Sequence, residues 1–411
     1  MPSGIGRSRG VCFAVQAAVP HMPHGATKED RMNYRRLGKT ELMVSEIGFG
    51  AEWMERKTPE EVAAVTRRFS QAGVNVLDCW MPEPEVRSNL GAAIAGERDR
   101  WIIQGHIGST WQNGQYVRTR DMDRVKPAFE DLLERLGTDH VELGMIHYVD
   151  NLAELDGIMQ GDFMAYVEEL QASGAIGHIG LSTHSPAVAR AAATSGRIEA
   201  VMFSANPAFD MMPASSSLDA LLAFSGGRLE NIEPERAELY ALCEREDIGL
   251  TVMKGYAGGR LLAAETSPFG VALTPVQCIH YALTRPAVAS IMVGAETVAH
   301  VDDALAYEAA DAAQRDYAAA LENASLSSPF GQCTYCGHCA PCAANIDIAL
   351  VNKFYDLAVM QPEAPASVRA HYEALEATAR SCIACQACEP RCPFGVDIAE
   401  RMKKAATLFG C

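Results

Sequence analysis

Two runs of closely spaced cysteines constrain this chain more than any other feature of its sequence. The last eighty residues hold nine of the thirteen cysteines. The runs read CTYCGHCAPC and CIACQACEPRCP, and their cysteines are Cys333, Cys336, Cys339, Cys342, Cys382, Cys385, Cys388 and Cys392. Three cysteines at two-residue spacing, with a fourth slightly further on and a proline (Pro393) behind it, are the ligand pattern of a 4Fe–4S cluster. The runs therefore predict two 4Fe–4S clusters and a protein that transfers electrons.

The four cysteines of one run are not expected to serve one cluster. In two-cluster ferredoxins, the fourth cysteine of each run ligates the other cluster. We therefore expect one cluster on Cys333, Cys336, Cys339 and Cys392, and the other on Cys382, Cys385, Cys388 and Cys342. Two zinc sites of four cysteines each are the alternative, since C-x2-C pairs also bind zinc. A zinc tetrahedron needs only two such pairs, so an unbroken triple favours the clusters.

The composition limits what else the chain contains. Its 411 residues, 48% of them hydrophobic, suffice for one barrel of about 250 residues and an appendage of under about a hundred. The net charge of −17 would repel nucleic acid and anionic membranes, so we expect neither as a partner. No apolar run in the sequence approaches the roughly eighteen residues of a membrane span. Oxygen-sensitive clusters and reduced thiolates predict a cytoplasmic protein.

Eight short apolar runs predict the strands of a parallel barrel. They are rich in Val and Ile, as is typical of strands buried on both faces. They cover residues 45–53, 74–80, 101–108, 140–149, 176–184, 200–206, 249–256 and 288–295. Helical stretches separate them; one is expected to begin at Thr58–Pro59 and end at Gly73, and another to begin at Asp123 and end at Gly137. Eight strands, each followed by a helix, predict an α/β fold, a (β/α)8 TIM barrel.

We expect four segments along the chain. Residues 1–31 predict a disordered extension, residues 32–309 the barrel, residues 310–332 a linker and residues 333–411 a small α-helical ferredoxin-like domain. About forty residues between the cysteine runs have helical periodicity, which favours the helical kind of two-cluster domain. Two connections are expected to cover a pocket. They are residues 208–233 after the sixth strand and STWQNGQYVRTRD, with Trp111 and Tyr116, after the third.

Five segments of the expected barrel form a recognisable pattern. They are YRRLGKTELMVSEIGFG (34–50), LGTDHVELGMIHYVD (136–150), IGHIGLSTHS (176–185), MKGYAGGRLL (253–262) and MVGAETVAHVDDAL (292–305). Together they resemble the aldo-keto reductase family, in particular its bacterial branch with C-terminal ferredoxin-like clusters. The resemblance covers residues 34–305, and the cysteine runs extend it to the C-terminus. It implies a catalytic tetrad of Asp, Tyr, Lys and His at the carboxyl ends of strands.

Two members of that tetrad match this chain and two do not. His147 ends the fourth strand and Asp78 ends the second, as the resemblance implies. Glu83 stands where the tyrosine is expected, and His106 stands where the lysine is expected. Ordinary carbonyl reduction would therefore lack the phenol acid that protonates the carbonyl and the lysine that lowers the pKa of that phenol.

The resemblance also implies a nicotinamide dinucleotide, whose phosphate the family holds through basic residues just after strand eight. This chain has GAETVAHVDDA there, beginning at Gly294, with Glu296, Asp302 and Asp303 but no Lys or Arg. Acidic residues repel a phosphate. In the family's nicotinamide pocket only Ser182 matches. If a dinucleotide binds, we expect NAD rather than NADP, with Ser182 and Gly294 among its contacts.

The carboxyl ends of the strands are where barrels of this type react. Asp78, His106 and His147 are expected to converge there with aromatic side chains, which predicts an acid–base site with stacking surfaces. Glu83 is either a further proton donor or a cap of the next helix. Lys254 either binds an anionic group of the substrate or pairs with a carboxylate of strand two. A single metal ion on Asp78, His106 and His147 is another alternative.

These features favour an iron–sulfur oxidoreductase in which two 4Fe–4S clusters pass single electrons to a small-molecule substrate, fed by a ferredoxin or a similar protein. A nicotinamide donates its electrons as a pair, whereas a cluster carries one, and the sequence has no flavin motif to couple them. One alternative is an NAD(P)-dependent carbonyl or alcohol oxidoreductase with structural or partner-linked clusters. Another is an electron-transfer or redox-sensing module whose barrel is not catalytic.

Overall fold

The computed structural model describes most of the chain. The described residues are 32–211, 233–317, 333, 339–359, 364, 366–392 and 395–410. The expected extension at 1–31, most of the connection at 208–233 and most of the linker at 310–332 lie outside them, as do Cys336 and Pro393. Among the described residues, no helix is long and apolar enough to cross a membrane.

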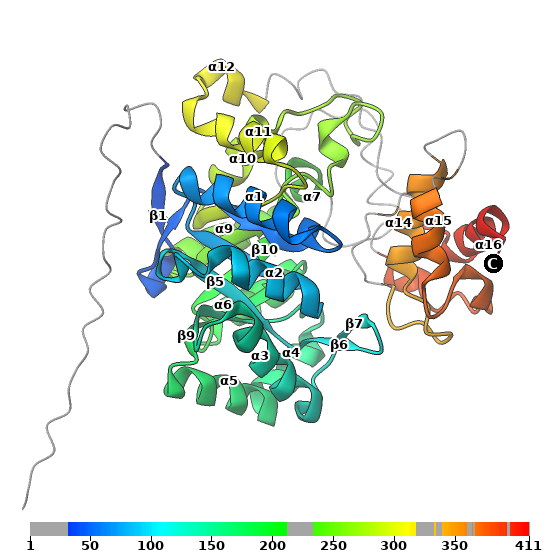
Figure 1. Ribbon diagram of the computed structural model, residues 1–411, viewed down its shortest axis with the longest axis horizontal. Helices are drawn as coiled ribbons and strands as arrows, with labels where there is room; N and C mark the ends of the chain where they lie inside the picture. Colours follow the sequence, from blue (N-terminus) through cyan, green and yellow to red (C-terminus); the bar gives the residue numbers. More distant parts are fainter. Residues whose placement is uncertain are drawn as a thin grey trace, which may run out of the picture.

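Eight parallel strands close into a barrel in which β12 pairs with β3 (Figure 1). In chain order they are β3 (Ile47–Gly50), β4 (Val76–Cys79), β5 (Ile102–Ile107), β8 (Val141–Ile146), β9 (Ile176–Thr183), β10 (Ala200–Ser204), β11 (Gly249–Met253) and β12 (Val288–Gly294). Each lies within one of the eight apolar runs of the sequence. The predicted (β/α)8 fold is therefore confirmed.

Helices follow the strands and surround the barrel (Figure 1). They are α1 (Pro59–Gln71), α2 (Pro84–Ile94), α3 (Met122–Leu136), α4 (Leu152–Gln160), α5 (Asp162–Ser173), α6 (Pro186–Thr194), α7 (Pro207–Asp210), α9 (Pro234–Arg245), α10 (Pro275–Leu283), α11 (Val298–Ala309) and α12 (Ala312–Arg315). Short 3-10 turns are η1 (Gly38–Thr40), η2 (Ala51–Met54), η3 (Arg98–Arg100), η4 (Arg260–Leu262), η5 (Ala379–Ser381) and η6 (Glu389–Arg391).

The helix ends follow capping rules, with one correction to the sequence-based expectation. Thr58 caps α1 through a capping box with Glu61, as expected for a helix beginning there. The cap of α3 is Asp121 rather than Asp123, because the Asp121 carboxylate accepts a hydrogen bond from the backbone N–H of Asp123. The helix ends at Gly137, whose φ of +65° suits glycine.

Two antiparallel hairpins were not predicted from the sequence. Strands β1 (Tyr34–Arg36) and β2 (Met43–Ser45) form the first. Leu37, which follows β1, and Val44 of β2 pack with inward-facing apolar side chains of the barrel. Strands β6 (Ser109–Gln112) and β7 (Gln115–Arg118) form the second, directly after β5. Its two-residue turn is Asn113–Gly114, both with positive φ, which is the geometry that Asn-Gly favours.

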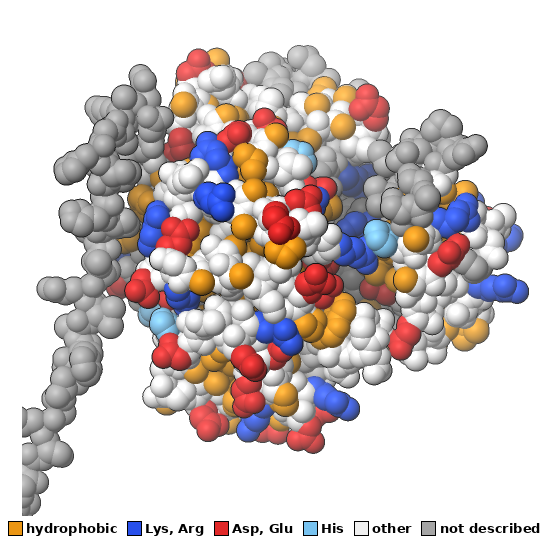
Figure 2. All heavy atoms as spheres, viewed as in Figure 1, with side chains coloured by type: hydrophobic (Ala, Val, Ile, Leu, Met, Phe, Trp, Pro, Cys, Tyr) orange, Lys and Arg blue, Asp and Glu red, His pale blue; other side chains and the backbone are white. Residues whose placement is uncertain are grey.

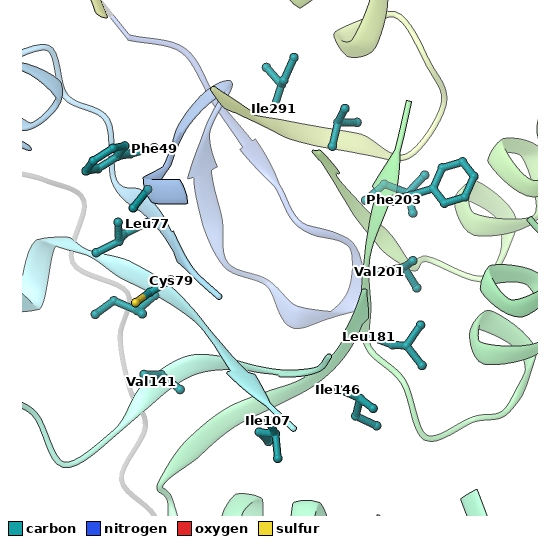
Figure 3. Close-up of a cluster of buried hydrophobic side chains, with 14 of the residues drawn as sticks. Phe49, Leu77, Cys79, Ile107, Val141, Ile146, Leu181, Val201, Phe203 and Ile291 are labelled. Atoms are coloured by element: carbon teal, nitrogen blue, oxygen red, sulfur yellow. The ribbon is translucent and has the colours of Figure 1, made fainter. Parts of the chain in front are cut away.

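The main hydrophobic core lies between the strands and the helices. Figure 3 shows side chains such as Phe49, Leu77 and Phe203 directed away from the ring of strands. Because side chains alternate along a strand, residues between these outward-facing ones point into the barrel. This alternation places several polar residues of β4 and β5 inside the barrel at its carboxyl end.

The C-terminal region is helical, as expected. Helices α14 (Ile348–Val359) and α15 (Ala366–Glu373) lie between the cysteine runs, and α16 (Ile398–Phe409) follows the second run. They enclose a small core in which Tyr372 stacks on Phe409, with 3.9 Å between ring centroids. In Figure 1 these helices form a lobe beside the barrel. The domain boundaries at residues 31, 309 and 332 stay predictions.

A buried ionic network joins the helices near the sixth strand. Asp210, which is fully buried, lies 3.1 Å from the guanidinium of Arg236. The hydroxyl of Tyr240 lies 2.9 Å from both carboxylate oxygens of Asp210, and that of Tyr281 donates to Oδ2 at 2.9 Å. Removing one member would leave the others without their partner in a region that excludes water.

We expect Asp210→Ala to lower the free energy of unfolding by about 3–5 kcal/mol, because the buried Arg236 charge would lose its partner. Asp139→Ala, at an exposed position paired with His140, should leave it nearly unchanged. Chemical denaturation followed by circular dichroism measures both. Equal effects of the two substitutions would contradict a structural role for the Asp210 network.

Candidate active site and cluster pocket

Four side chains form a continuous chain of hydrogen bonds at the carboxyl end of the barrel. Nε2 of His106 lies 3.0 Å from Oδ1 of Asp78, and its Nδ1 lies 2.8 Å from Nδ1 of His147. Nε2 of His147 lies 2.8 Å from the hydroxyl of Tyr116. The structure thus brings together three side chains that the sequence singled out and joins Tyr116 to them. We call these four side chains the relay.

A buried amide holds the inner end of the relay. Nε2 of Gln104 donates to Oδ1 of Asp78 at 3.0 Å, and the hydroxyl of Thr251 donates to Oε1 of Gln104 at 2.9 Å. Gln104, Thr251 and Asp78 are all buried. Because an unpaired buried polar group costs about 1–3 kcal/mol, these contacts restrict Asp78 to one orientation.

Two arginines anchor the β6–β7 hairpin, and with it Tyr116, to the end of β8. The guanidinium of Arg120 donates to the carbonyl of His147, and that of Arg118 donates to the carbonyl of Tyr148, each at 2.6 Å. Both guanidinium groups also pair with the Glu154 carboxylate of α4, at 3.1 and 3.6 Å. The hairpin is therefore held by charge-assisted contacts as well as by its own strand pairing.

Burial sets the protonation of the outer half of the relay. It raises the pKa of Tyr116, although the positive charge of Arg118 opposes this. It also lowers the pKa of His147 well below the ordinary value for histidine, and the neighbouring His106 adds to this. Near neutral pH, Tyr116 is therefore a protonated phenol and His147 a neutral imidazole.

Lys254 pairs with a carboxylate, but not one of strand two. Its ammonium lies 3.3 Å from Glu52, which belongs to η2 after β3. Pairing with strand two was one of two alternatives for Lys254, and the carboxylate observed beside it comes instead from the turn after the first strand. Burial opposes ionisation of Glu52, but Lys254 and Lys353 outweigh it and lower its pKa.

Glu83 lies outside the relay. It occupies the N-cap position of α2, yet its side chain makes no capping hydrogen bond. Burial and the charge of Glu85 raise its pKa. Burial and the charges of Glu52 and Glu83 raise the pKa of the nearby Glu55 to about 7. The two carboxyls form a second group of acids at the barrel mouth.

The two expected contacts of a dinucleotide are both engaged within the protein. The hydroxyl of Ser182 accepts a hydrogen bond from the backbone N–H of Tyr148 at 2.8 Å. Gly294 packs against Trp53, so closely that a Cβ on the glycine would lie 2.5 Å from the indole ring. Nζ of Lys353, in α14, lies 4.9 Å from the centroid of a ring of the same indole. Trp53 thus contacts both the end of β12 and the C-terminal lobe.

The acidic segment after β12 would repel the phosphate of a dinucleotide less than its sequence suggests. Asp302 pairs with Arg68 at 2.6 Å, and Glu296 lies 3.8 Å from Lys57. Both basic residues come from α1 or the turn before it, so the sequence of the segment alone could not reveal them. The segment still contributes no Lys or Arg of its own.

The C-terminal lobe contacts the barrel beside the relay. Besides Lys353 on Trp53, Arg260 donates to the carbonyl of Cys333 at 3.1 Å, and Gln115 of the β6–β7 hairpin donates to Glu376. Figure 2 shows Lys and Arg side chains and a histidine gathered along the junction of the two lobes. The barrel mouth and the cysteine-bearing lobe are therefore adjacent.

One pocket of the C-terminal lobe matches an expected set of cluster ligands. It is lined by Cys342, Cys382, Cys385 and Cys388, and its remaining wall is largely apolar, with Ile346, Ile348, Ile383, Ile398 and Met402. Backbone N–H groups of Ala344 and Ala384 donate to the sulfurs of Cys342 and Cys382 at 3.4 Å. Four thiols, N–H donors to sulfur and an apolar wall fit a 4Fe–4S cluster.

The other two metal sites considered from the sequence are a second cluster and a single metal ion at the barrel mouth. Cys336 lies outside the described residues, so the set Cys333, Cys336, Cys339 and Cys392 stays a prediction. Within the described part of the chain, no group of three or more His, Cys, Asp and Glu side chains is arranged to hold a single metal ion. That statement covers Asp78, His106 and His147, whose nitrogens and carboxylate bond to one another.

Comparisons with known proteins agree with this architecture. A model of the Aldo/keto reductase family matches residues 46–272, and a model of a 4Fe-4S dicluster domain matches residues 332–397. Aldo-keto reductase YhdN of Bacillus subtilis (strain 168) is 28% identical over 164 residues, covering 38% of this chain and 48% of the relative. The uncharacterized oxidoreductase YqkF of the same strain is 26% identical over 178 residues, covering 42% and 55%. The chain thus spans about half the length of these relatives.

A solved structure shows the same fold. The aldo-keto reductase AKR11C1 from Bacillus halodurans (holo form) has a TM-score of 0.55 and 21% identity, covering 72% of this chain and 98% of that chain. At this identity the likeness concerns the fold alone.

Tyr116 is the member of the relay that the sequence did not assign. It was named only as part of a polar, aromatic connection expected to cover a pocket. The Asn113–Gly114 pair between two short extended runs is a hairpin signal that could have placed Tyr116 on a strand. No local pattern indicates that this hairpin folds back over β8, since Arg118 and Arg120 reach carbonyls some thirty residues away.

We expect the anaerobically prepared protein to contain about eight irons per chain and as much acid-labile sulfide, as two 4Fe–4S clusters require. Cys342→Ala should lower the iron content to about four, because one cluster would lose a ligand. Cys278→Ala, which changes a buried thiol of the barrel, serves as the matched control. Four irons in the unaltered protein would contradict two clusters, and an unchanged content in Cys342→Ala would contradict its role as a ligand.

Proposed function

Because the chain belongs to the aldo/keto reductase family and matches a 4Fe-4S dicluster domain behind its barrel, we propose that it is an iron–sulfur oxidoreductase acting on a small organic substrate. The cysteines of the C-terminal lobe hold two 4Fe–4S clusters, which exchange electrons one at a time. A ferredoxin or a similar protein is the external electron carrier. The substrate binds at the carboxyl end of the barrel, next to the Tyr116 end of the relay.

The observation that carries this proposal is the course of α14. Ile348, in its first turn, lines the pocket of Cys342, Cys382, Cys385 and Cys388. Lys353, five residues later, lies over Trp53 at the barrel mouth. At 1.5 Å per residue, about 8 Å of helix separates these two positions along its axis. One helix therefore joins the cysteine pocket to the place where barrels of this kind react.

The clusters take the place of a nicotinamide in this proposal. Trp53 packs on Gly294, and Ser182 is occupied with the backbone of Tyr148. The two residues that would transfer and stabilise a proton in ordinary carbonyl reduction are replaced by Glu83 and His106. Hydride transfer would therefore lack part of the dinucleotide-binding site and the residues that protonate the carbonyl. Single-electron reduction needs neither a dinucleotide nor that particular pair of residues.

The aromatic walls of the mouth suit a conjugated or hydroxylated substrate. Trp80 stacks against His147, with 5.7 Å between ring centroids, and meets the ring of Tyr116 edge-on at 5.3 Å. The guanidinium of Arg118 lies 4.6 Å from the centroid of Tyr148. Flat π surfaces bind flat substrates, and a conjugated substrate stabilises the radical that a single electron creates. Asp78, His106 and His147 provide protons, with Glu83 and Lys254 at the rim.

Neither NADH nor NADPH should act on the anaerobic protein. We expect no bleaching of the cluster absorbance and no binding tighter than about 1 mM by calorimetry, because Trp53 occupies the surface of Gly294. Dithionite should bleach the same sample, which shows that the clusters accept electrons. Bleaching by either nicotinamide without added substrate would instead favour an NAD(P)-dependent oxidoreductase.

A further inference from the structure

In the inner half of the relay, between Asp78 and His106, the donor and the acceptor of the hydrogen bond are defined. Gln104 donates to Oδ1 of Asp78, so that oxygen acts as an acceptor. His106 therefore bonds to it by donating its Nε2–H. A neutral imidazole that carries its proton on Nε2 has a lone pair on Nδ1. The Nδ1 of His106 is then an acceptor for the next member of the relay.

The outer half continues in the same direction. His147 donates its Nδ1–H to His106, because two lone pairs cannot face each other at 2.8 Å. Buried and neutral, His147 then has a lone pair on Nε2, which accepts the O–H of Tyr116. Every proton of the relay thus points inward, from the barrel mouth toward Asp78.

One added proton reverses this direction. Placed on His106, it forms an imidazolium that Asp78 stabilises at 3.0 Å. His106 then donates through Nδ1 to His147, and His147 donates through Nε2 to the oxygen of Tyr116. The O–H of Tyr116 is released from His147 and can donate to a group in the mouth.

We propose that Tyr116 is the acid that protonates the substrate, in place of the phenol that the family resemblance puts at the position of Glu83. This inference rests on the proposed function, in which iron–sulfur clusters supply the electrons. As a substrate oxygen gains negative charge, the O–H proton of Tyr116 passes to it. Tyr116 regains a proton from Nε2 of His147, and His147 regains one from Nδ1 of His106.

The step balances in protons and charge. One proton leaves the Asp78–His106 pair and one arrives on the substrate, while Tyr116 and His147 end neutral as they began. A conjugated carbonyl that takes up two electrons needs a second proton, which comes from water after the relay is recharged. The substrate group must therefore be a proton acceptor such as a carbonyl oxygen within reach of the Tyr116 hydroxyl.

The test compares variants of the full-length, dithionite-reduced holoprotein, with cinnamaldehyde as a conjugated carbonyl probe. Tyr116→Phe should slow cluster reoxidation by about 10²- to 10⁴-fold, the contribution of a positioned acid. The probe concentration for half-maximal rate should change little, since the aromatic ring remains. Asp78→Asn keeps an acceptor oxygen for His106 but removes the charge that stabilises the stored proton, so it should also be slow.

Two control variants separate this role from general damage and from a rival acid. Tyr34→Phe, in β1, removes another phenol hydrogen bond, the one to the carbonyl of Gly73 after α1, and should leave the rate unchanged. Glu83→Gln removes the carboxyl at the family position. A large loss in Glu83→Gln with normal reoxidation in Tyr116→Phe would overturn the proposal and assign the acid to Glu83.

Nitrogen-15 spectra of histidine-labelled holoprotein provide a readout that needs no substrate. His147, assigned with His147→Gln, should carry its proton on Nδ1 and accept a hydrogen bond at Nε2. Tyr116→Phe should shift the Nε2 resonance toward that of an unbonded imidazole nitrogen. If the probe fails to oxidise even the unaltered protein, the proposed function is contradicted for conjugated carbonyls. An unchanged His147 spectrum in Tyr116→Phe overturns the relay independently of that result.

Discussion

The alternation of side chains along a closed ring of parallel strands is the constraint on which the rest of this structure depends. In β4 and β5, apolar residues face the helices, so Asp78, Gln104 and His106 must face the interior. Most buried polar groups in proteins are hydrogen-bonded. Asp78 is hydrogen-bonded to both Gln104 and His106, and these two bonds hold its carboxylate against the His106 imidazole.

The relay also depends on an element that the barrel does not require. The β6–β7 hairpin follows β5, and it places the phenol of Tyr116 against His147, just after the next strand of the ring, β8. Its position comes from Arg118 and Arg120, which bond to carbonyls at the end of β8 and share Glu154. The hairpin thus brings a phenol next to a histidine that lies at the end of a different strand.

The junction of the two lobes is built from charges of both signs around one indole. Lys254 and Lys353 lower the pKa of Glu52, and Lys353 lies over Trp53. Burial raises the pKa of Glu55 to about 7, so this carboxyl changes charge near neutral pH. The same contacts keep the cysteine pocket, through α14, close to the barrel mouth.

The sequence by itself determined the barrel, the helical C-terminal lobe and the cysteines of the two runs, because strand length, helix caps and two-residue cysteine spacing are local. It also identified Asp78, His106 and His147 as residues at strand ends. It did not place Tyr116 beside His147, and it did not reveal the Glu52 partner of Lys254 or the basic partners of Asp302 and Glu296. Each of those contacts joins residues far apart in the chain. Only the tertiary structure decided them, since loop placement follows from packing and charge pairing across the fold rather than from periodicity.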